Sequence, residues 1–537
     1  MQAPVKDHSP SSGSSAGPGV KVLDGLLSAL KPNTALLTQL GHGIEKESLR
    51  VTCDGQLADT GHPRALGSAL RHPHITTDFS EAQPELITGV HTSAAKCIEE
   101  LDDIHRYLHA NIDDELLWAS SMPCILREDK DIPVGRYGTS NIARAKTVYR
   151  LGLGNRYGRL MQTISGIHYN FSMPQAFWPA LAEARGEPFT DDFATRCYLD
   201  LIRNFRRDSW LLIYLFGASP ALCKTFVKGK DHELERFDDG TLFRPHGTSL
   251  RMGRLGYTSD AQTSLHVSYN TLQDYAETIR KGLSTNYPEY ENYKGQVDGE
   301  YQQLNAALLQ IENEFYGTIR PKRTINKGER PLTALLDRGV EYVEVRCLDV
   351  NPFLPAGIDS IQARFIDLFL LNCLLQPSAA DSLEESEVLT RNQLAVVERG
   401  REPGLTLQRG EQQVPMTEWA AELLAGCEKI AAVIDGESNN DESAFALDCQ
   451  SKKLQNPELT PSARILAQMR EQSIPFYRFA MNASIAHSGY YADHPLRDAR
   501  LKEFEDLATN SIDEQRAMEE AETESFEEFL EHYLALP

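Results

Sequence analysis

The feature that most constrains this chain is a set of short segments in which apolar residues alternate with functional side chains. Val343, Val345 and Cys347 of the segment EYVEVRCLD share one face of a predicted strand. Glu344 and Arg346 share the opposite face, because successive side chains of a strand point to opposite sides. Such a strand can bury one side in a core and present the other to a ligand.

The segment GIEKESLRV carries two carboxylates on the same side of a strand. Alternation places Glu45 and Glu47 together, opposite Ile44, and about 6.6 Å apart along the strand. Like charges at this distance repel each other unless a cation lies between them. This strand is less regular than the first, since Lys46 and Ser48 share the side of Ile44.

Two further segments extend the pattern. In TISGIHYNFS, His168 lies on the face opposite Ile167. In ITTDFSEAQPELIT, Asp78 and Glu85 bracket a predicted turn that contains Pro84. Together the four segments predict an antiparallel sheet with one packed face and one functional face.

The side chains on the functional face are typical of a site for a hard cation. Several carboxylate oxygens with at most one imidazole suit Mg²⁺ or Mn²⁺ better than zinc. Magnesium sites rich in oxygen ligands usually share the ion with substrate phosphates. Three arginines, Arg251, Arg320 and Arg346, suit phosphate or carboxylate oxygens.

Composition argues against several classes of protein. The chain has 54 Lys and Arg against 77 Asp and Glu, a formal net charge of -23, so no nucleic-acid partner is expected. No membrane partner is expected either, because the longest apolar run, near residues 210–216, is far shorter than the roughly 20 residues that cross a bilayer. Nine scattered cysteines without a C-x-x-C pair favour reduced thiols in a cytoplasmic enzyme.

The chain divides into three predicted parts. Residues 1–20 are rich in Ser, Gly and Pro and are predicted to be a disordered leader. Residues 21–470 form the predicted catalytic domain, and residues 471–537 an acidic helical C-terminal segment. Residues 501–537 hold twelve Asp and Glu against two Lys and Arg, which indicates a solvated helical face, with a docking surface as the alternative.

Apolar periodicity predicts the remaining elements. Strand-like patterns cover residues 41–90, 163–172 and 341–349. Helices are predicted over residues 20–40, with a break at Pro32, and over 93–120, 140–162, 176–216, 300–316, 358–376 and most of the chain beyond 377. The helix over 358–376 is expected to be amphipathic, and residues 320–323 are expected to form a basic turn.

The common nucleotide and hydrolase motifs are missing. No G-x-x-x-x-G-K-[ST] occurs, and GLGNRYG at 152–158 is one residue too long for the dinucleotide fingerprint. Neither G-x-S-x-G nor H-E-x-x-H is present.

The segments quoted above resemble the bacterial glutamate–cysteine ligases. TGHPRALGSAL, YLFGASPALC, TSLRMGRLGYT, LQIENEFYGTIRPKR and LTPSARIL extend the resemblance, in family order, across residues 21–470. It implies ATP-dependent ligation of the L-glutamate γ-carboxylate to the L-cysteine amine, through a γ-glutamyl phosphate, as the first step of glutathione biosynthesis. It also implies an α+β fold like that of glutamine synthetase, in which a curved, mostly antiparallel sheet surrounded by helices forms an active-site funnel. The chain is expected to be a monomer.

The resemblance also implies residue roles. Glu47 and Glu85 would serve the ion at the acyl phosphate and the incoming cysteine, whereas Glu45 and Glu344 would serve the ions that bridge the ATP phosphates. The implied metal ligands are Glu45, Glu47, Asp78, Glu85, His168 and Glu344.

The implied substrate and catalytic residues complete the set. Arg346 resembles the residue that contacts the transferred phosphoryl group, and Arg251 an anchor for a substrate carboxylate. The catalytic residues are then Arg346, Arg251 and Glu344, the residues at the nucleotide phosphates are Arg346 and Arg320, and the substrate-binding residues are Tyr149, Arg150, Gln162, Arg251, Tyr257 and Tyr316.

Two alternatives stay open. A related carboxylate–amine ligase with a different amine acceptor would use the same functional face. A non-catalytic binding protein would use the acidic C-terminal part. The second alternative predicts the loss of one or more carboxylates at positions 45, 47, 78, 85 and 344, and all five are present.

Overall fold

The computed structural model of the protein describes residues 18–123, 125–256, 260–263, 265–326 and 328–536. Most of the predicted leader and the substrate residue Tyr257 lie outside these ranges. Helix α1 begins at Pro18, inside the segment that was predicted to be disordered, so that prediction is wrong for residues 18–20.

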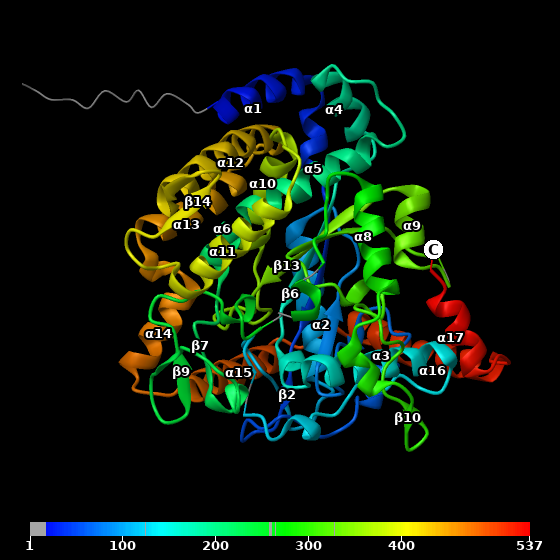
Figure 1. The fold of residues 1–537 in the computed structure, drawn as a ribbon. Helices are drawn as coiled ribbons and strands as arrows, with labels where there is room; N and C mark the ends of the chain where they lie inside the picture. Colours follow the sequence, from blue (N-terminus) through cyan, green and yellow to red (C-terminus); the bar gives the residue numbers. More distant parts are fainter. Residues whose placement is uncertain (1–17, 124, 257–259, 264, 327, 537) are drawn as a thin grey trace, which may run out of the picture.

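A six-stranded sheet lies at the centre of the molecule, with helices around it (Figure 1). Every neighbouring pair of its strands is antiparallel. In sheet order, the strands are β12 (Ile319–Lys322), β13 (Tyr342–Leu348), β6 (Ile167–Ser172), β1 (Gly41–Glu47), β4 (Pro84–Ile87) and β3 (Ile75–Thr77). The prediction of a mixed α and β fold with an antiparallel sheet is confirmed.

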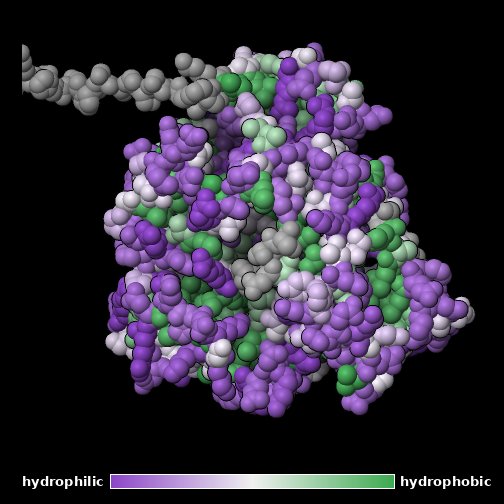
Figure 2. Space-filling model, viewed as in Figure 1, coloured by the Kyte–Doolittle hydropathy of each residue, from purple (hydrophilic) through white to green (hydrophobic). Residues whose placement is uncertain are grey.

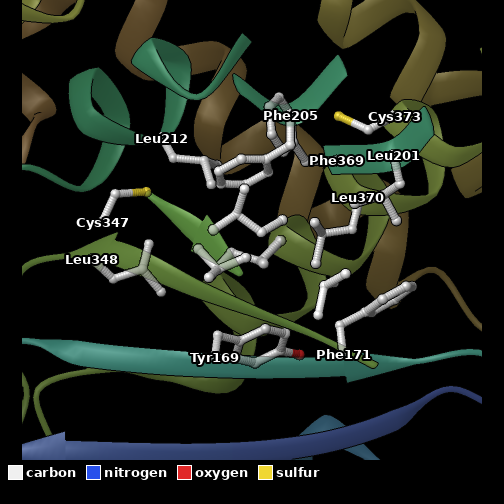
Figure 3. Packing of buried hydrophobic residues seen from close by; sticks show 14 of the residues in the cluster. Tyr169, Phe171, Leu201, Phe205, Leu212, Cys347, Leu348, Phe369, Leu370 and Cys373 are labelled. Atoms are coloured by element: carbon white, nitrogen blue, oxygen red, sulfur yellow. The ribbon is translucent and has the colours of Figure 1, made fainter. Parts of the chain in front are cut away.

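One face of this sheet forms the main hydrophobic core. Ile44, Tyr169, Phe171, Val343 and Val345 are at most 1% exposed and belong to one cluster. Figure 3 shows Tyr169 and Phe171 of β6 pointing toward residues of helices α5 (Phe193–Asp208) and α10 (Ser360–Leu375). The alternation in the sequence therefore placed the packed face correctly, and the functional side chains lie on the opposite one.

Lys46 explains why the first strand is the least regular in sequence. Its side chain is 3% exposed, on the packed side of β1. Lys46 Nζ donates to His105 Nε2 at 2.7 Å, so a neighbouring helix supplies the polar partner that a buried amine needs.

Helices surround the sheet (Figure 1). Their bounds are α1 Pro18–Ala29, α2 Ala94–His109, α3 Asn141–Tyr157, α4 Phe177–Arg185, α5 Phe193–Asp208, α6 Trp210–Phe216, α7 Asp260–Thr263, α8 Leu272–Ser284, α9 Pro331–Arg338, α10 Ser360–Leu375, α11 Leu383–Arg399, α12 Met416–Ser438, α13 Glu442–Gln455, α14 Pro461–Glu471, α15 Phe476–Asp493, α16 Asp498–Ala521 and α17 Phe526–Leu534.

Short strands and turns connect these elements. The remaining strands are β2 (Arg50–Val51) with β5 (Leu116–Leu117), β7 (Ala221–Cys223) with β9 (Thr241–Phe243) and β8 (Glu235–Arg236), β10 (Gln296–Val297) with β11 (Glu300–Tyr301), and β14 (Thr406–Arg409) with β15 (Gln412–Pro415). Pro84 opens β4 rather than lying in the turn before it, in keeping with the tolerance for proline at the first residue of a strand.

The helix predicted over 300–316 is wrong. The segment holds the short strand β11 and one 3-10 turn, Glu312–Glu314. The Arg156 guanidinium, on α3, donates to the Gln303 side chain and to the Ala307 carbonyl at 3.0–3.1 Å. These tertiary contacts satisfy carbonyl groups that a helix would pair internally, and they outweigh the local propensity.

Two other expectations need correction. Helix α10 spans Ser360–Leu375, but nearly all its residues are buried, so it is not amphipathic; it packs against α5, α12 and α13. The helix predicted over 93–120 ends at His109, and the chain then turns into β5.

Figure 2 shows one face that is mostly hydrophilic, with apolar residues scattered among the polar ones. The eight cysteines within the described ranges are free. None of the described helices is both long and apolar enough to span a membrane. The division of the chain at residue 470 stays a prediction.

Candidate active site

Strand pairing brings the predicted metal ligands together on the functional face of the sheet. Glu45 on β1 lies opposite His168 on β6, and Glu47 lies opposite Glu85 on β4. Glu344 on β13 lies opposite Asn170, which follows His168 by two residues on β6. Residues about 300 positions apart in sequence thus become neighbours through the register of the sheet.

His168 joins two groups of ligand atoms. One group is Glu45, His168 and Glu344, and the other is Glu47, Glu85 and His168; within each group the nearest ligand atoms all lie within 4.8 Å of one another. His168 Nδ1 lies 3.1 Å from Glu45 Oε2 and 3.7 Å from Glu344 Oε1. His168 Nε2 lies 3.7 Å from Glu47 Oε1.

Hydrogen bonds orient the two carboxylates of β1. The Gly166 amide donates to Glu47 Oε2 at 2.8 Å, and Asn170 Nδ2 donates to Glu45 Oε1 at 3.0 Å. Each carboxylate therefore has one oxygen held by the protein and the other turned toward His168.

The side chains around Glu47 and Glu85 supply too little positive charge to offset the burial and mutual repulsion of these carboxylates. Burial and the nearby Asp78 raise the pKa of Glu47 to about 8, against the opposing effect of Arg251 and Arg346. Burial, Asp78 and the neighbouring glutamates raise the pKa of Glu85 well above its usual range. A divalent cation would relieve this repulsion, and carboxylate oxygens with one imidazole fit Mg²⁺ or Mn²⁺.

The group around Glu45 and Glu344 has cations beside it. Lys322 Nζ lies 3.4 Å from Glu344 Oε1, and an Arg346 guanidinium nitrogen lies 3.2 Å from Glu344 Oε2. Although burial opposes it, these cations hold the pKa of Glu344 well below its usual range. The pKa of Glu45 is lowered as well, since its hydrogen bond and charge interaction with His168 outweigh burial and repulsion by Glu344.

Lys322 was not singled out by the sequence reasoning, which interpreted Arg320–Arg323 as a basic turn. The segment is strand β12 instead, and β12 pairs with β13 at Arg320 and Glu344. Strand alternation from Arg320 would have placed Lys322 on the same side, so the signal was present once the segment was taken as a strand.

Asp78 lies beside the cluster and belongs to neither group. Its charge raises the pKa of both Glu47 and Glu85, so its carboxylate is close to them. Its backbone carbonyl accepts hydrogen bonds from the Tyr137 hydroxyl, at 2.9 Å, and from Arg150 Nε. Its assignment as a metal ligand stays a prediction.

Helix α3 lines the side of the cluster next to Asp78. Arg150 lies over the Tyr137 ring, 4.8 Å from its centroid. Lys146, one turn earlier on α3, is partly buried near Arg150, Glu85 and Asp78. Desolvation and Arg150 lower the pKa of its amine to about 8. The sequence reasoning missed Lys146, although the i, i+4 spacing to Arg150 places both on one helix face.

The predicted substrate residues Gln162 and Tyr316 are in contact. Gln162 Nε2 donates to the Tyr316 hydroxyl at 3.3 Å, and the Tyr316 ring lies 5.8 Å from the Tyr157 ring. Tyr149 and Tyr316 lie close enough for their hydroxyl groups to interact electrostatically. The structure thus brings Tyr149, Gln162 and Tyr316 together between α3 and the segment before β12.

The three predicted arginines are placed differently. Arg346 is partly exposed and lies beside Glu344, whereas Arg251 is 1% exposed. Arg251 donates to the Arg346 carbonyl at 2.9 Å, and a Cβ atom on Gly166 would lie only 2.0 Å from its guanidinium. Arg320 is buried and donates to the carbonyls of Asn313 and Phe315. Arg346 therefore contacts a carboxylate of the ligand cluster, Glu344, at 3.2 Å, and Arg251 acts on Glu47 from a buried position.

Comparisons with known proteins agree on one family. A family model described as glutamate-cysteine ligase matches residues 27–396. Glutamate–cysteine ligase of Pseudomonas putida KT2440 is 49% identical over 516 residues, which cover 96% of this chain and 98% of the relative. That of Alcanivorax borkumensis SK2 is 50% identical over 506 residues, which cover 93% of this chain and 96% of the relative.

Solved structures give the same result. The crystal structure of glutamate–cysteine ligase from Francisella tularensis in complex with AMP is similar with a TM-score of 0.87 and 36% identity. The match covers 92% of this chain and 97% of that one. A bifunctional glutathione synthetase from Pasteurella multocida has a similar fold over 87% of this chain and 55% of its own, with a TM-score of 0.68 and 24% identity.

Proposed function

The chain belongs to the glutamate–cysteine ligase family, and we propose that its carboxylate cluster carries out that ligation through a γ-glutamyl phosphate. The enzyme joins the γ-carboxylate of L-glutamate to the amino group of L-cysteine at the expense of ATP, which is the first step of glutathione biosynthesis. The observation that carries the mechanism is the pair of ligand groups that share His168.

The proposed reaction has two steps. An oxygen of the γ-carboxylate attacks the γ-phosphorus of ATP, and ADP leaves. The cysteine nitrogen then attacks the acyl carbon, loses a proton, and displaces phosphate. Both steps develop negative charge on phosphoryl and acyl oxygens, so positioning and charge stabilisation suffice, without a protein nucleophile.

Six residues would hold the Mg²⁺ or Mn²⁺ ions of this proposal. When bound, the ions neutralise the phosphate oxygens and polarise the acyl group. Glu47 and Glu85 face the acyl phosphate and the acceptor, and Glu45 and Glu344 face the nucleotide. The full set is Glu45, Glu47, Asp78, Glu85, His168 and Glu344.

Arg346 and Lys322 would contact the transferred phosphoryl group. Both lie within 3.4 Å of Glu344, so this carboxylate holds two cations in place. These cations would stabilise the negative charge that develops on the phosphoryl oxygens only during the reaction. Arg320 supports them from within β12. Arg251 donates to the Arg346 carbonyl, which makes it a positioning residue as well as the predicted anchor for a substrate carboxylate.

The amino-acid acceptor would lie against α3. In this proposal Tyr149 and Tyr316 line its pocket, and Gln162 fixes the Tyr316 hydroxyl. The third predicted tyrosine, Tyr257, lies outside the described residues. Arg150 borders the same space from α3. In this proposal the curved sheet is the wall of a funnel like that of glutamine synthetase, and the enzyme is a cytoplasmic monomer that binds neither nucleic acid nor membrane.

A substrate-omission assay tests the proposal. Phosphate release is expected only when Mg²⁺, ATP, glutamate and cysteine are present together. Equal rates with cysteine, 2-aminobutyrate and alanine would favour the alternative, a related ligase with a different acceptor. Phosphate release that needs no amine acceptor would contradict the ligation.

A further inference from the structure

The acidic end of the chain contacts the elements that border the proposed acceptor pocket. We call residues 519–535 the C-terminal clasp; it comprises the end of α16, a short linker and α17. A reciprocal capping box between Ser525 and Glu528 defines the start of α17. Helices α3, α9, α16 and α17 lie together on one side of the molecule (Figure 1).

The clasp supplies carboxylates to the start of α3. Helix α3 has no acidic residue in its first turn, and the hydroxyl of its N-cap residue, Ser140, has no hydrogen-bond partner. Instead, the Asn141 amide donates to Glu522 Oε2 at 3.0 Å, and the Thr139 amide donates to Glu519 Oε1 at 2.8 Å. The N-terminus of a helix needs such acceptors and favours negative charge.

An aromatic anchor fastens the clasp to the outer side of α3. Phe526 is 2% exposed and packs with Ala145 and Val148 of α3 and with Leu304. The Arg144 guanidinium lies over its ring, 4.0 Å from the centroid. Burial of an aromatic ring is the largest single apolar contribution that a short helix can make to such a contact.

The other side of the clasp holds the segment between β11 and β12. The Tyr301 hydroxyl donates to Glu527 Oε1 at 2.9 Å. Arg330 donates to the Ala535 carbonyl at 2.8 Å and pairs with both carboxylate oxygens of Glu312, at 2.9 and 3.0 Å. The clasp therefore ties α3 to the segment 301–316, which the sequence alone had suggested was a helix.

Tyr533 brings the clasp within electrostatic reach of the pocket. Burial and Glu312 raise the pKa of its hydroxyl, and the guanidinium groups of Arg330 and Arg150 oppose them. The end of α17 thus lies close enough to Arg150 for the two side chains to interact electrostatically.

The contacts of the clasp bracket the residues proposed to bind the acceptor. Helix α3 carries Tyr149 and Arg150, and Tyr149 itself packs against the Phe526 cluster. The segment 301–316 ends at Tyr316, on the opposite wall. A shift of either element by about 1 Å would misplace these side chains, which is enough to weaken substrate positioning strongly.

We propose that the C-terminal clasp positions α3 and the segment 301–316, and so determines the apparent affinity for the amino-acid acceptor while leaving the ATP side unaffected. This inference rests on the proposed function of the pocket. Phe526, Glu522 and Tyr533 act through Tyr149 and Arg150 and are positioning residues. The acidic run then has a role beyond a solvated face.

Steady-state kinetics of the full-length enzyme test the anchor. Phe526→Ala is expected to raise the KM for cysteine roughly tenfold or more, with the KM for ATP within about twofold of the wild type. Phe526→Leu, which keeps an apolar side chain, should recover most of the affinity. Phe445→Ala is the matched control, because Phe445 is 54% exposed on α13.

If Phe526→Ala fails to fold, a milder pair of variants tests the carboxylate contacts at the start of α3. Glu522→Gln removes the negative charge of the carboxylate that accepts a hydrogen bond from the Asn141 amide. It should raise the KM for cysteine about two- to threefold, since a charge at a helix terminus has a modest effect. Glu520→Gln changes a neighbouring exposed glutamate and should leave the KM values unchanged.

Hydrogen exchange separates the failure of this inference from the failure of the proposed function. In Phe526→Ala, residues 141–150 should exchange faster than in the wild type, together with the rise in the KM for cysteine. Faster exchange with an unchanged KM would reduce the clasp to a structural element and overturn the inference, as would equal rises in the KM for cysteine and ATP. A wild type that releases no phosphate with all substrates present would overturn the proposed function itself.

Discussion

The two ligand groups that share His168 differ in the source of their positive charge. Beside Glu344, the protein supplies Lys322 and Arg346, and the pKa of Glu344 is lowered. Beside Glu47 and Glu85, burial and like charges dominate, and the pKa values of both are raised. One group is thus ionised by the protein alone, whereas the other needs an external cation to be fully ionised at neutral pH.

This difference teaches how one sheet can perform two tasks. In the proposed mechanism, strands β12 and β13 add cations to the site for phosphate groups, which bring their own negative charge. Strands β1 and β4 would then concentrate carboxylates where a divalent ion holds the acyl phosphate. The same alternation of side chains builds both, so the division of labour comes from which strands lie side by side.

The largest expected effect is on turnover. Arg346→Ala and Glu47→Gln should each lower kcat by roughly a hundredfold or more, the scale for loss of a preorganised charge partner. Phosphate release with all substrates present measures this. An Arg346→Ala enzyme with normal turnover would contradict its role at the phosphoryl group, and a thermal midpoint close to that of the wild type would exclude unfolding as the cause.

A second prediction contrasts the two groups by stability in EDTA. Glu344→Gln removes a carboxylate from two partly buried cations and should lower the free energy of unfolding by about 2–3 kcal/mol, less than for a fully buried pair. Glu85→Gln removes a source of repulsion and should leave this free energy unchanged or raise it. Denaturant titration checks both values. The comparison fails if the two variants are destabilised equally.

The smallest expected effect is a pH dependence of Mg²⁺ stabilisation. The pKa of Glu47 is raised from 4.5 to about 8 in the folded protein, so the stability that its bound proton contributes is present below pH 4.5 and is lost as the pH rises through about 8. At pH 6.5, Mg²⁺ must displace the proton bound to Glu47 before it can bind there. At pH 8.5, Glu47 is already mostly ionised, so no proton has to leave. The rise in Tm on adding Mg²⁺ should therefore be about 1–2 °C larger at pH 8.5, and an equal rise at both pH values would contradict it.

Local patterns predicted much of the sheet and its cluster. Alternation alone placed Val343, Val345 and Tyr169 in the core and Glu45, Glu344 and His168 on the opposite face. It failed where distant side chains decide the backbone. The segment 300–316 has helical periodicity, but the distant Arg156 binds Gln303, Ala307 and Glu314 within it, and no local pattern contains that information.

Residues near the site were missed for a similar reason. Lys322 was assigned to a turn because its neighbours are basic, although β12 pairs with β13. Lys146 lies close to Glu85 and Asp78 only in the folded chain, where their charges act on its amine. The acidic run at the C-terminus gave no sign in sequence that two of its glutamates accept amide hydrogen bonds at the start of α3.

The sequence by itself determined the composition of each strand face, because alternation is a property of neighbouring residues along one chain. It also determined the family, since many segments match in order. Only the tertiary structure decided the order of the strands, which carboxylates lie beside Lys322 and Arg346, and how the C-terminal clasp holds α3. The physical reason is that charge interactions and burial depend on distances between residues far apart in the chain, and those distances exist only once the sheet has formed.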